Sequence, residues 1–253
     1  MLADIHGNLP ALEAAIADAE AAGADTYVLN GDIAAGPLPA QTLDRLVALG
    51  DRAVWVHGNA ERELIDAYDG KISSDLPESI REVLVSSAAA MQPRHRDLIA
   101  DLPLSVRLDV DGLGPVRFCH ATARDDQEIV LVDSPVAWYQ DAFAGVEEET
   151  VVLGHTHMLF DRLVDRRRFI CPGSVGMPYG RAGAHWALLG PGVQLRVARY
   201  DPQQAATLLH AENAANTAPW LDEFVRENLL ATPSDAEALQ VFTEIARAAR
   251  ASA

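Results

Sequence analysis

Short β-prone runs alternate with helical segments over the first 57 residues, and this alternation restricts the fold more than any other feature. Apolar residues recur at helical spacing in residues 9–22, between Asn8, a good helix N-cap, and Gly23. The other elements predicted here are strands at residues 26–29 and 53–57 and a helix at residues 40–49. Such alternation with short loops is typical of βαβ units, in which functional groups follow the carboxyl ends of parallel strands.

The remainder of the chain divides into a helical stretch, a β-rich stretch and a helical tail. Residues 60–101 contain no clear strand and are predicted to form a helical insertion or cap. From Leu104 onward, β-prone runs predict a hairpin, further strands and one short helix at residues 136–143. We therefore expect an α/β domain over residues 1–200 with a helical extension, residues 201–253, packed on it. The amphipathic end of this tail favours packing or self-association as a homo-oligomer over chemistry.

Charge and composition restrict the partners of this chain. Its 253 residues carry 37 acidic and 20 basic side chains, a formal net charge of −17 that repels polyphosphate backbones and anionic membranes. We therefore expect neither an extended nucleic acid nor a membrane as a partner. Hydrophobic residues at 49% and charged residues at 23% exclude long disorder. Since no apolar run reaches the roughly 18 to 20 residues that cross a bilayer, a cytoplasmic protein is expected.

The beginning of the chain and its cysteines give two further expectations. Only three residues precede Asp4, whereas a central strand normally has about five or six, which leaves open whether the true start lies upstream of Met1. Cys119 and Cys171 lie in strand-like runs, where a cysteine usually serves as a small buried hydrophobe and not as a disulfide partner.

Five short segments each end an apolar run and offer metal-ligating side chains. They are Asp4-Ile5-His6, Gly31-Asp32, Gly58-Asn59, Cys119-His120 and Gly154-His155-Thr156-His157. Each alone has an ordinary structural explanation, such as a turn dipeptide or a core histidine. Together, five strand ends at one edge of the sheets are expected to converge on one place. The sequence therefore predicts a metal centre built from Asp4, His6, Asp32, Asn59, His120, His155 and His157.

The chemistry of this set indicates two divalent transition-metal ions. Two carboxylates, one amide oxygen and four imidazoles form a mixed nitrogen and oxygen donor set, which suits Mn, Fe, Zn, Ni or Co better than Ca or Mg. Two such ions, about 3.5 to 4 Å apart, need a shared carboxylate and a bridging hydroxide between them.

The order of the five segments resembles the pattern of the calcineurin-like metallophosphoesterase superfamily, which runs D-x-H, G-D-x-x-D, G-N-H-D/E, H and G-H-x-H. The similarity spans Asp4 to about Leu189. The stretches ADIHGNLPALEA, HGNAER, CHATARDD and CPGSVGMP are also similar to the smaller bacterial branch of simple phosphodiesterases and phosphatases. The resemblance implies a four-layer αββα sandwich of the metallophosphoesterase type, with the metals at one edge.

The resemblance also implies a role for each ligand. One metal site would use Asp4, His6 and His157, the other Asn59, His120 and His155, with Asp32 bridging the two. The residues expected to act directly in catalysis are Asp32, Asn59, His120 and Arg124. Arg124 lies four residues past His120, where it either binds a phosphate oxygen through a fork-like contact or lies in a solvated loop. Asp125 and Asp126 are interpreted as a solvated pair.

Two departures from the family pattern affect the expected substrate. Ala60 stands where the pattern has the histidine that often lies near the leaving-group oxygen, a loss worth about 10² to 10⁴ in rate for poor leaving groups. His57 and Arg124 are the alternatives that would replace it. The second acid of G-D-x-x-D is also missing, since Ala35 occupies its position. Together these departures argue against a protein Ser/Thr phosphatase.

The sequence predicts metal-dependent hydrolysis of a small phosphodiester or phosphomonoester by a metal-bridging hydroxide. The residues 60–101 and 124–134 are the expected lids over the site. Two alternatives stay open: a non-catalytic metal-binding interaction scaffold, as in the retromer subunit that shares this fold, and a nuclease or cyclic-nucleotide phosphodiesterase. The sequence leaves the physiological substrate, the native metal and the choice between monoester and diester open.

Overall fold

The computed structural model of the chain describes residues 1–214 and 218–252. The helices are α1 (Leu9–Ala21), α2 (Pro39–Val47), α3 (Asn59–Tyr68), α4 (Glu78–Ala90), α5 (Pro93–Ala100), α6 (Val136–Ala142), α7 (Pro202–Glu212), α8 (Trp220–Val225) and α9 (Asp235–Ser252), with short turns η1 (Gly50–Arg52) and η2 (Arg226–Leu230). The strands are β1 (Tyr27–Asn30), β2 (Ala53–Val56), β3 (Ser105–Val110), β4 (Gly114–Cys119), β5 (Thr150–Val152), β6 (Leu159–Val164), β7 (Arg167–Pro172), β8 (Ala184–Leu189) and β9 (Val193–Ala198).

The first layer of strands is assembled around the start of the chain. β1 pairs in parallel with β2, and β8 pairs with β9 in antiparallel orientation. The residues before Asp4 lie between these two pairs: the Leu2 amide donates to the Val28 carbonyl at 2.8 Å, and the Met1 carbonyl accepts from the Ala187 amide of β8 at 3.1 Å. The short run before Asp4 therefore acts as a central strand of this layer.

The second layer is a five-stranded sheet with the order β3-β4-β5-β7-β6. Its three inner strands, β4, β5 and β7, run parallel, and the outer strands β3 and β6 pair with them in antiparallel orientation. The hairpin expected after Leu104 is formed by β3 and β4. Because β4 and β5 run parallel, the residues that follow them reach the same edge of the sheet.

The two sheets pack face to face through buried aliphatic and aromatic side chains. Met1, Ala3, Val28 and Val56 of the first layer meet residues of the second, namely Val116, Phe118, Val152 and Ile170. These inward-facing side chains form the interior of a two-sheet sandwich.

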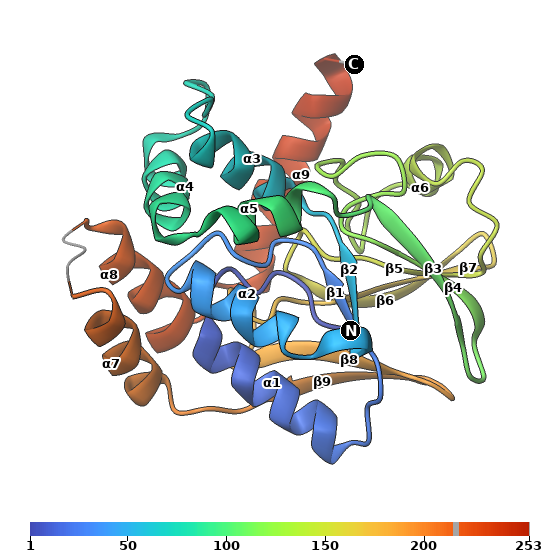
Figure 1. Cartoon of the computed structure of the whole chain (residues 1–253). Helices are drawn as coiled ribbons and strands as arrows, with labels where there is room; N and C mark the ends of the chain where they lie inside the picture. Colours follow the sequence, from blue (N-terminus) through green and yellow to red (C-terminus); the bar gives the residue numbers. More distant parts are fainter. Residues whose placement is uncertain (215–217, 253) are drawn as a thin grey trace.

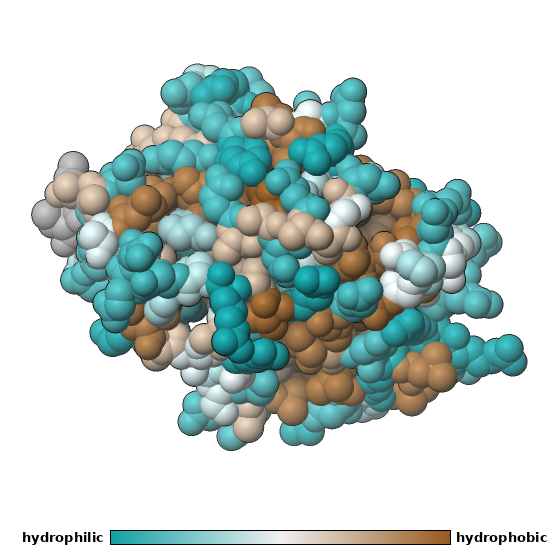
Figure 2. Space-filling view, turned by 90° about the horizontal axis from the view of Figure 1, so that it is seen from below, coloured by the Kyte–Doolittle hydropathy of each residue, from teal (hydrophilic) through white to brown (hydrophobic). Residues whose placement is uncertain are grey.

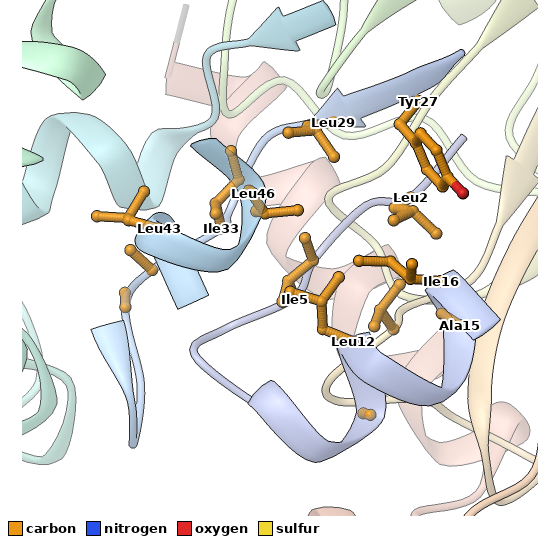
Figure 3. Packing of buried hydrophobic residues seen from close by; sticks show 14 of the residues in the cluster. Leu2, Ile5, Leu12, Ala15, Ile16, Tyr27, Leu29, Ile33, Leu43 and Leu46 are labelled. Carbon is orange, nitrogen blue, oxygen red and sulfur yellow. The ribbon is translucent and has the colours of Figure 1, made fainter. Parts of the chain in front are cut away.

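Helices cover the outer face of each sheet (Figure 1). On the first, Leu12 and Ile16 of α1 and Leu43 of α2 pack with Leu29 of β1 (Figure 3). On the second, the Tyr139 ring of α6 lies 4.6 Å from the Phe169 ring of β7, measured between centroids. The expected four-layer αββα sandwich is therefore confirmed.

The helical additions also occur where they were expected. α3, α4 and α5 fill the stretch 60–101, and α7, α8 and α9 follow β9. α9 packs on the main body, since Ala238 and Ala246 are buried in one cluster with Ile129 and Leu131. Within the predicted extension 201–253, residues 215–217 and 253 lie outside the described residues. The division into a domain and an extension stays a prediction.

Three further findings concern the helices, the surface and the cysteines. None of the helices within 1–214 and 218–252 has the length and apolarity that a membrane-spanning helix requires. On the face shown in Figure 2, hydrophobic residues gather in the lower middle and hydrophilic residues surround them. Cys119 and Cys171 are buried and free, as expected.

Candidate metal centre

The backbone at the predicted ligands is unusual, because five non-glycine residues have positive φ angles. These are Asp4 (55°), His6 (48°), Asp32 (53°), His155 (67°) and His157 (56°). The left-handed region costs a residue with a side chain about 1–3 kcal/mol, and such residues cluster at functional sites. This clustering is evidence for a functional site that is independent of the identity of the side chains.

The side chains at these strand ends form two groups that share one carboxylate. Potential ligand atoms of Asp4, His6, Asp32 and His157 lie within 4.8 Å of one another, and those of Asp32, His120 and His155 do the same. The oxygens of Asp32 face different groups: Oδ1 lies 3.3 Å from Nε2 of His120, and Oδ2 lies 3.7 Å from Nε2 of His6. This is the geometry that a bridging carboxylate requires.

The remaining predicted ligand, Asn59, lies beside the second group. It is the first residue of α3, and its Oδ1 lies 3.3 Å from Nε2 of His120. The structure thus brings all seven predicted ligands together. The donor set fits divalent transition ions, and Oδ2 of Asp4 is buried with no hydrogen-bond partner among the described residues.

The imidazole rings are oriented by backbone carbonyls. Nδ1 of His6, His120 and His157 lies 3.2, 2.9 and 3.0 Å from the carbonyl oxygens of Ala35, Asn30 and Met177, respectively. In each case the contact leaves Nε2 for a metal. His155 is reversed: its Nε2 lies 3.2 Å from the Gln127 carbonyl, which leaves Nδ1. Contacts of this type fix the tautomer of a metal-ligating histidine.

Burial and mutual charge perturb the pKa values of these groups. Burial alone would raise the pKa of Asp32, but the adjacent His120 holds it well below its usual range. Burial would likewise lower the pKa of His120, yet the charge of Asp32 outweighs it and raises that pKa to about 10. Burial, followed by the positive charge of His120, lowers the pKa of His155 to about 4. The site therefore holds strong negative charge on Asp32 in a place where a cation can replace the protons.

Glu61 belongs to the site although the sequence analysis did not single it out. Its side chain is fully buried and accepts hydrogen bonds from the amides of Asp32, Ile33 and Gly58 at 2.8, 2.7 and 2.9 Å. Burial, followed by the negative charge of Asp32, raises the pKa of Glu61 to about 7. Its place three residues after Gly58, the residue that caps α3, is the available sequence signal, because it corresponds to the acidic position of a capping box.

Glu61→Gln is expected to lower the free energy of unfolding by about 2–4 kcal/mol, because an amide nitrogen would face buried N–H groups that now share a carboxylate. Urea denaturation of the metal-free protein measures the change. Glu82→Gln, at an exposed position of α4, is the control and should change the free energy by less than about 0.5 kcal/mol. Equal stability of the two variants would contradict this role of Glu61.

The other predicted residues have contacts of their own. The half-exposed Arg124 donates to Glu128 at 2.8 Å and to Asp141 at 2.7 Å. These contacts do not bring it to the seven ligands, so its phosphate-binding role stays a prediction. Ala60 is 5% exposed and packs in the apolar cluster of the first layer.

The expectation of a solvated Asp125–Asp126 pair is wrong for Asp126. Its side chain is only 13% exposed, its Oδ2 lies 3.2 Å from Nε2 of His57, and Arg62 also donates to it. Partners 64 or more residues away remove this carboxylate from solvent, which neighbouring sequence could not indicate.

A cavity of about 600 Å³ lies away from this centre, next to the start of β1 and the end of β8. None of the seven predicted ligands lines it. The candidate metal centre lies instead at the carboxyl ends of β1, β2, β4 and β5, where a ligand site is expected in a parallel arrangement of strands.

Comparisons with known proteins agree with this architecture. The sequence matches the calcineurin-like phosphoesterase superfamily domain over residues 1–190. A hypothetical protein from Pyrococcus horikoshii has a similar crystal structure, with a TM-score of 0.74 at 20% identity, covering 89% of this chain and 94% of that one. A metallophosphoesterase from Sphaerobacter thermophilus is similar with a TM-score of 0.68 at 22% identity, covering 88% and 96%. A search of curated proteins finds no match. The two structural likenesses show the fold, and the match over residues 1–190 shows that the chain belongs to the calcineurin-like phosphoesterase superfamily.

Proposed function

We propose that this protein hydrolyses a small phosphodiester or phosphomonoester with the help of two divalent transition-metal ions. The observation that carries the proposal is the pair of ligand groups joined by Asp32. Membership of the phosphoesterase superfamily supports hydrolysis of phosphoesters in general. Two ions side by side, when bound, supply positive charge to the phosphoryl oxygens and lower the pKa of water.

The side chains divide this task between charge and position. Asp32 would contribute one oxygen to each group, and the imidazoles would contribute nitrogens already turned inward by the carbonyls behind them. Asn59 would add a neutral oxygen ligand beside His120. With only Asp4 and Asp32 as anionic ligands, the loaded centre keeps a local excess of positive charge, which attracts a small anion within a protein of net charge −17.

The alanine at position 60 restricts the substrates. No imidazole at this position protonates the leaving oxygen, and the small Ala60 side chain is buried in the core. His57, three residues earlier in the chain, is one alternative, but its Nε2 lies 3.2 Å from Oδ2 of Asp126. We therefore propose that esters with good leaving groups, which depart without a proton, are the preferred substrates.

A metal-reconstituted assay tests the proposal. Metal-free protein is supplied with Mn²⁺, Ni²⁺ or Co²⁺ and given bis-p-nitrophenyl phosphate or p-nitrophenyl phosphate. We expect hydrolysis only with metal, and a decrease of about 10² or more in His155→Ala, because second-group ligands place charge at the phosphoryl oxygens.

His210→Ala is the matched control, since this histidine lies on α7 with 46% of its side chain exposed. It should keep the wild-type rate. An unchanged rate in His155→Ala would contradict the proposed site. Failure to hydrolyse either ester with any of the metals would favour the non-catalytic scaffold instead.

A further inference from the structure

His155 is held differently from the other three histidines of the centre. The carbonyl that contacts His120 belongs to Asn30 at the end of β1, a residue that is itself paired in the sheet. The carbonyl that contacts His155 belongs to Gln127, in the loop between β4 and α6. No residue of this loop pairs with a strand of either sheet. The Gln127 carbonyl is therefore held in place mainly through side-chain contacts of the loop.

Asp126 anchors that loop to the first layer, whereas Asp125 orders it from within, since Oδ1 of Asp125 accepts from the Gln127 and Glu128 amides at 2.7 Å. Arg62 of α3 donates to both of its oxygens, from Nε at 3.0 Å and from Nη2 at 3.1 Å. Nε2 of His57, at the end of β2, lies 3.2 Å from the same carboxylate. A bidentate contact with a guanidinium group fixes the orientation of the carboxylate as well as its distance. Asp126 therefore anchors the loop to the end of the first sheet.

The loop also reaches the second group through the side chain of Gln127. Its Nε2 donates to Oε1 of Glu63 at 3.2 Å. Glu63 is nearly buried, and this burial raises the pKa of Glu63, although an interaction with the Asn59 side chain acts in the opposite direction and lowers this pKa. One residue therefore contacts His155 through its carbonyl and approaches Asn59 through its amide. By contrast, the ring contacts of the first group come from Ala35 and Met177 in other segments.

We propose that Asp126 is a positioning residue for the second metal site, the one formed by Asn59, His120 and His155 with Asp32. It acts by fixing Gln127, which sets the ring orientation of His155 and the position of Asn59. This inference rests on the proposed two-metal function and assigns to one loop the control of one of the two sites. Partners that orient metal ligands are worth about 10- to 100-fold in metal affinity.

The test compares metal binding in wild-type protein and Asp126→Asn, which keeps the size of the side chain and removes its charge. Calorimetric titration of the metal-free proteins with Mn²⁺ should show two sites in the wild type. In the variant, one site should be about 10- to 100-fold weaker and the other unchanged within about twofold. With Co²⁺ as the probe, the absorption bands of one site should change while those of the other persist.

Asp161→Asn is the matched control. Asp161 also accepts two hydrogen bonds from one arginine, Arg168, at 2.8 and 2.6 Å, but it lies on β6 and outside the metal centre. Its titration curve should equal that of the wild type. Asp126→Glu restores the charge and should recover part of the lost affinity.

Three outcomes would overturn the inference. The first is an unchanged titration curve in Asp126→Asn. The second is equal weakening of both sites together with a lower melting temperature of the metal-free variant, which would assign Asp126 a general structural role. The third is a wild-type protein that binds fewer than two ions; that result refutes the proposed two-metal function itself, and it is recognised without any variant.

Discussion

Asp32→Ala is expected to remove hydrolysis almost completely, by about 10³-fold or more. The change deletes the one carboxylate that both ligand groups share. Two cations bound there would then repel each other without a negative charge between them. Interactions of this type stabilise the transition state by several kcal/mol, and each 1.36 kcal/mol corresponds to a factor of ten in rate. The measurement is the rate of hydrolysis of bis-p-nitrophenyl phosphate at saturating Mn²⁺, together with the number of ions bound per chain.

Two further variants make this result interpretable. Asp109→Ala removes a carboxylate of β3 whose side chain is 75% exposed, and it should leave both rate and metal content unchanged. Asp32→Asn keeps the shape of the side chain and accepts the hydrogen bond from the Ala60 amide, which Asp32 now accepts at 2.8 Å, but it removes the negative charge. If Asp32→Asn kept the wild-type rate, the bridging role would be wrong even in a correctly folded protein.

Phe118→Ala is expected to lower the free energy of unfolding by about 3–5 kcal/mol. Phe118 lies on β4 with 1% of its surface exposed, between the two sheets and near Val28 and Val152. Truncation of a buried phenylalanine removes its transfer energy and leaves a cavity that a packed sandwich fills only partly. Urea denaturation followed by circular dichroism measures the loss.

Leu163→Ala provides the comparison for this core variant. Leu163 lies on the edge strand β6 and is 71% exposed, so its truncation should change the free energy by no more than about 0.5 kcal/mol. A loss below about 1 kcal/mol in Phe118→Ala would show that the contact between the sheets contributes less than its burial implies.

The sequence was sufficient to predict which side chains converge at the candidate metal centre, because each predicted segment follows an apolar strand. Asp4, Asp32, Asn59, His120 and His155 are all found by this local rule, and parallel strands place them at a common edge without further information. The same local information predicts the helices and strands, since each depends on residues within one or two turns of the chain.

The interactions that support the ligands could not be predicted in the same way. Asp126 and Arg62 are 64 residues apart, and Glu61 lies 29 residues from the Asp32 amide that it accepts from. No local sequence pattern links the two residues of either pair. The insertion of the first three residues between β1 and β8 likewise depends on a strand more than 180 residues later in the chain. Sequence patterns therefore predicted the residues that converge at the candidate metal centre, but not those that hold these residues in place.

The distribution of the ligands between the two sheets has a consequence for how the protein can be studied. Asp4, His6, Asp32 and Asn59 follow the first layer, whereas His120, His155 and His157 follow strands of the second. Bound ions would therefore cross-link the two layers at one edge. A ligand that binds only the native state, supplied at a hundred times its dissociation constant, raises the free energy of unfolding by about 2.7 kcal/mol. A thermal-shift screen could thus rank metals, and later phosphoesters, by their effect on melting before any natural substrate is identified.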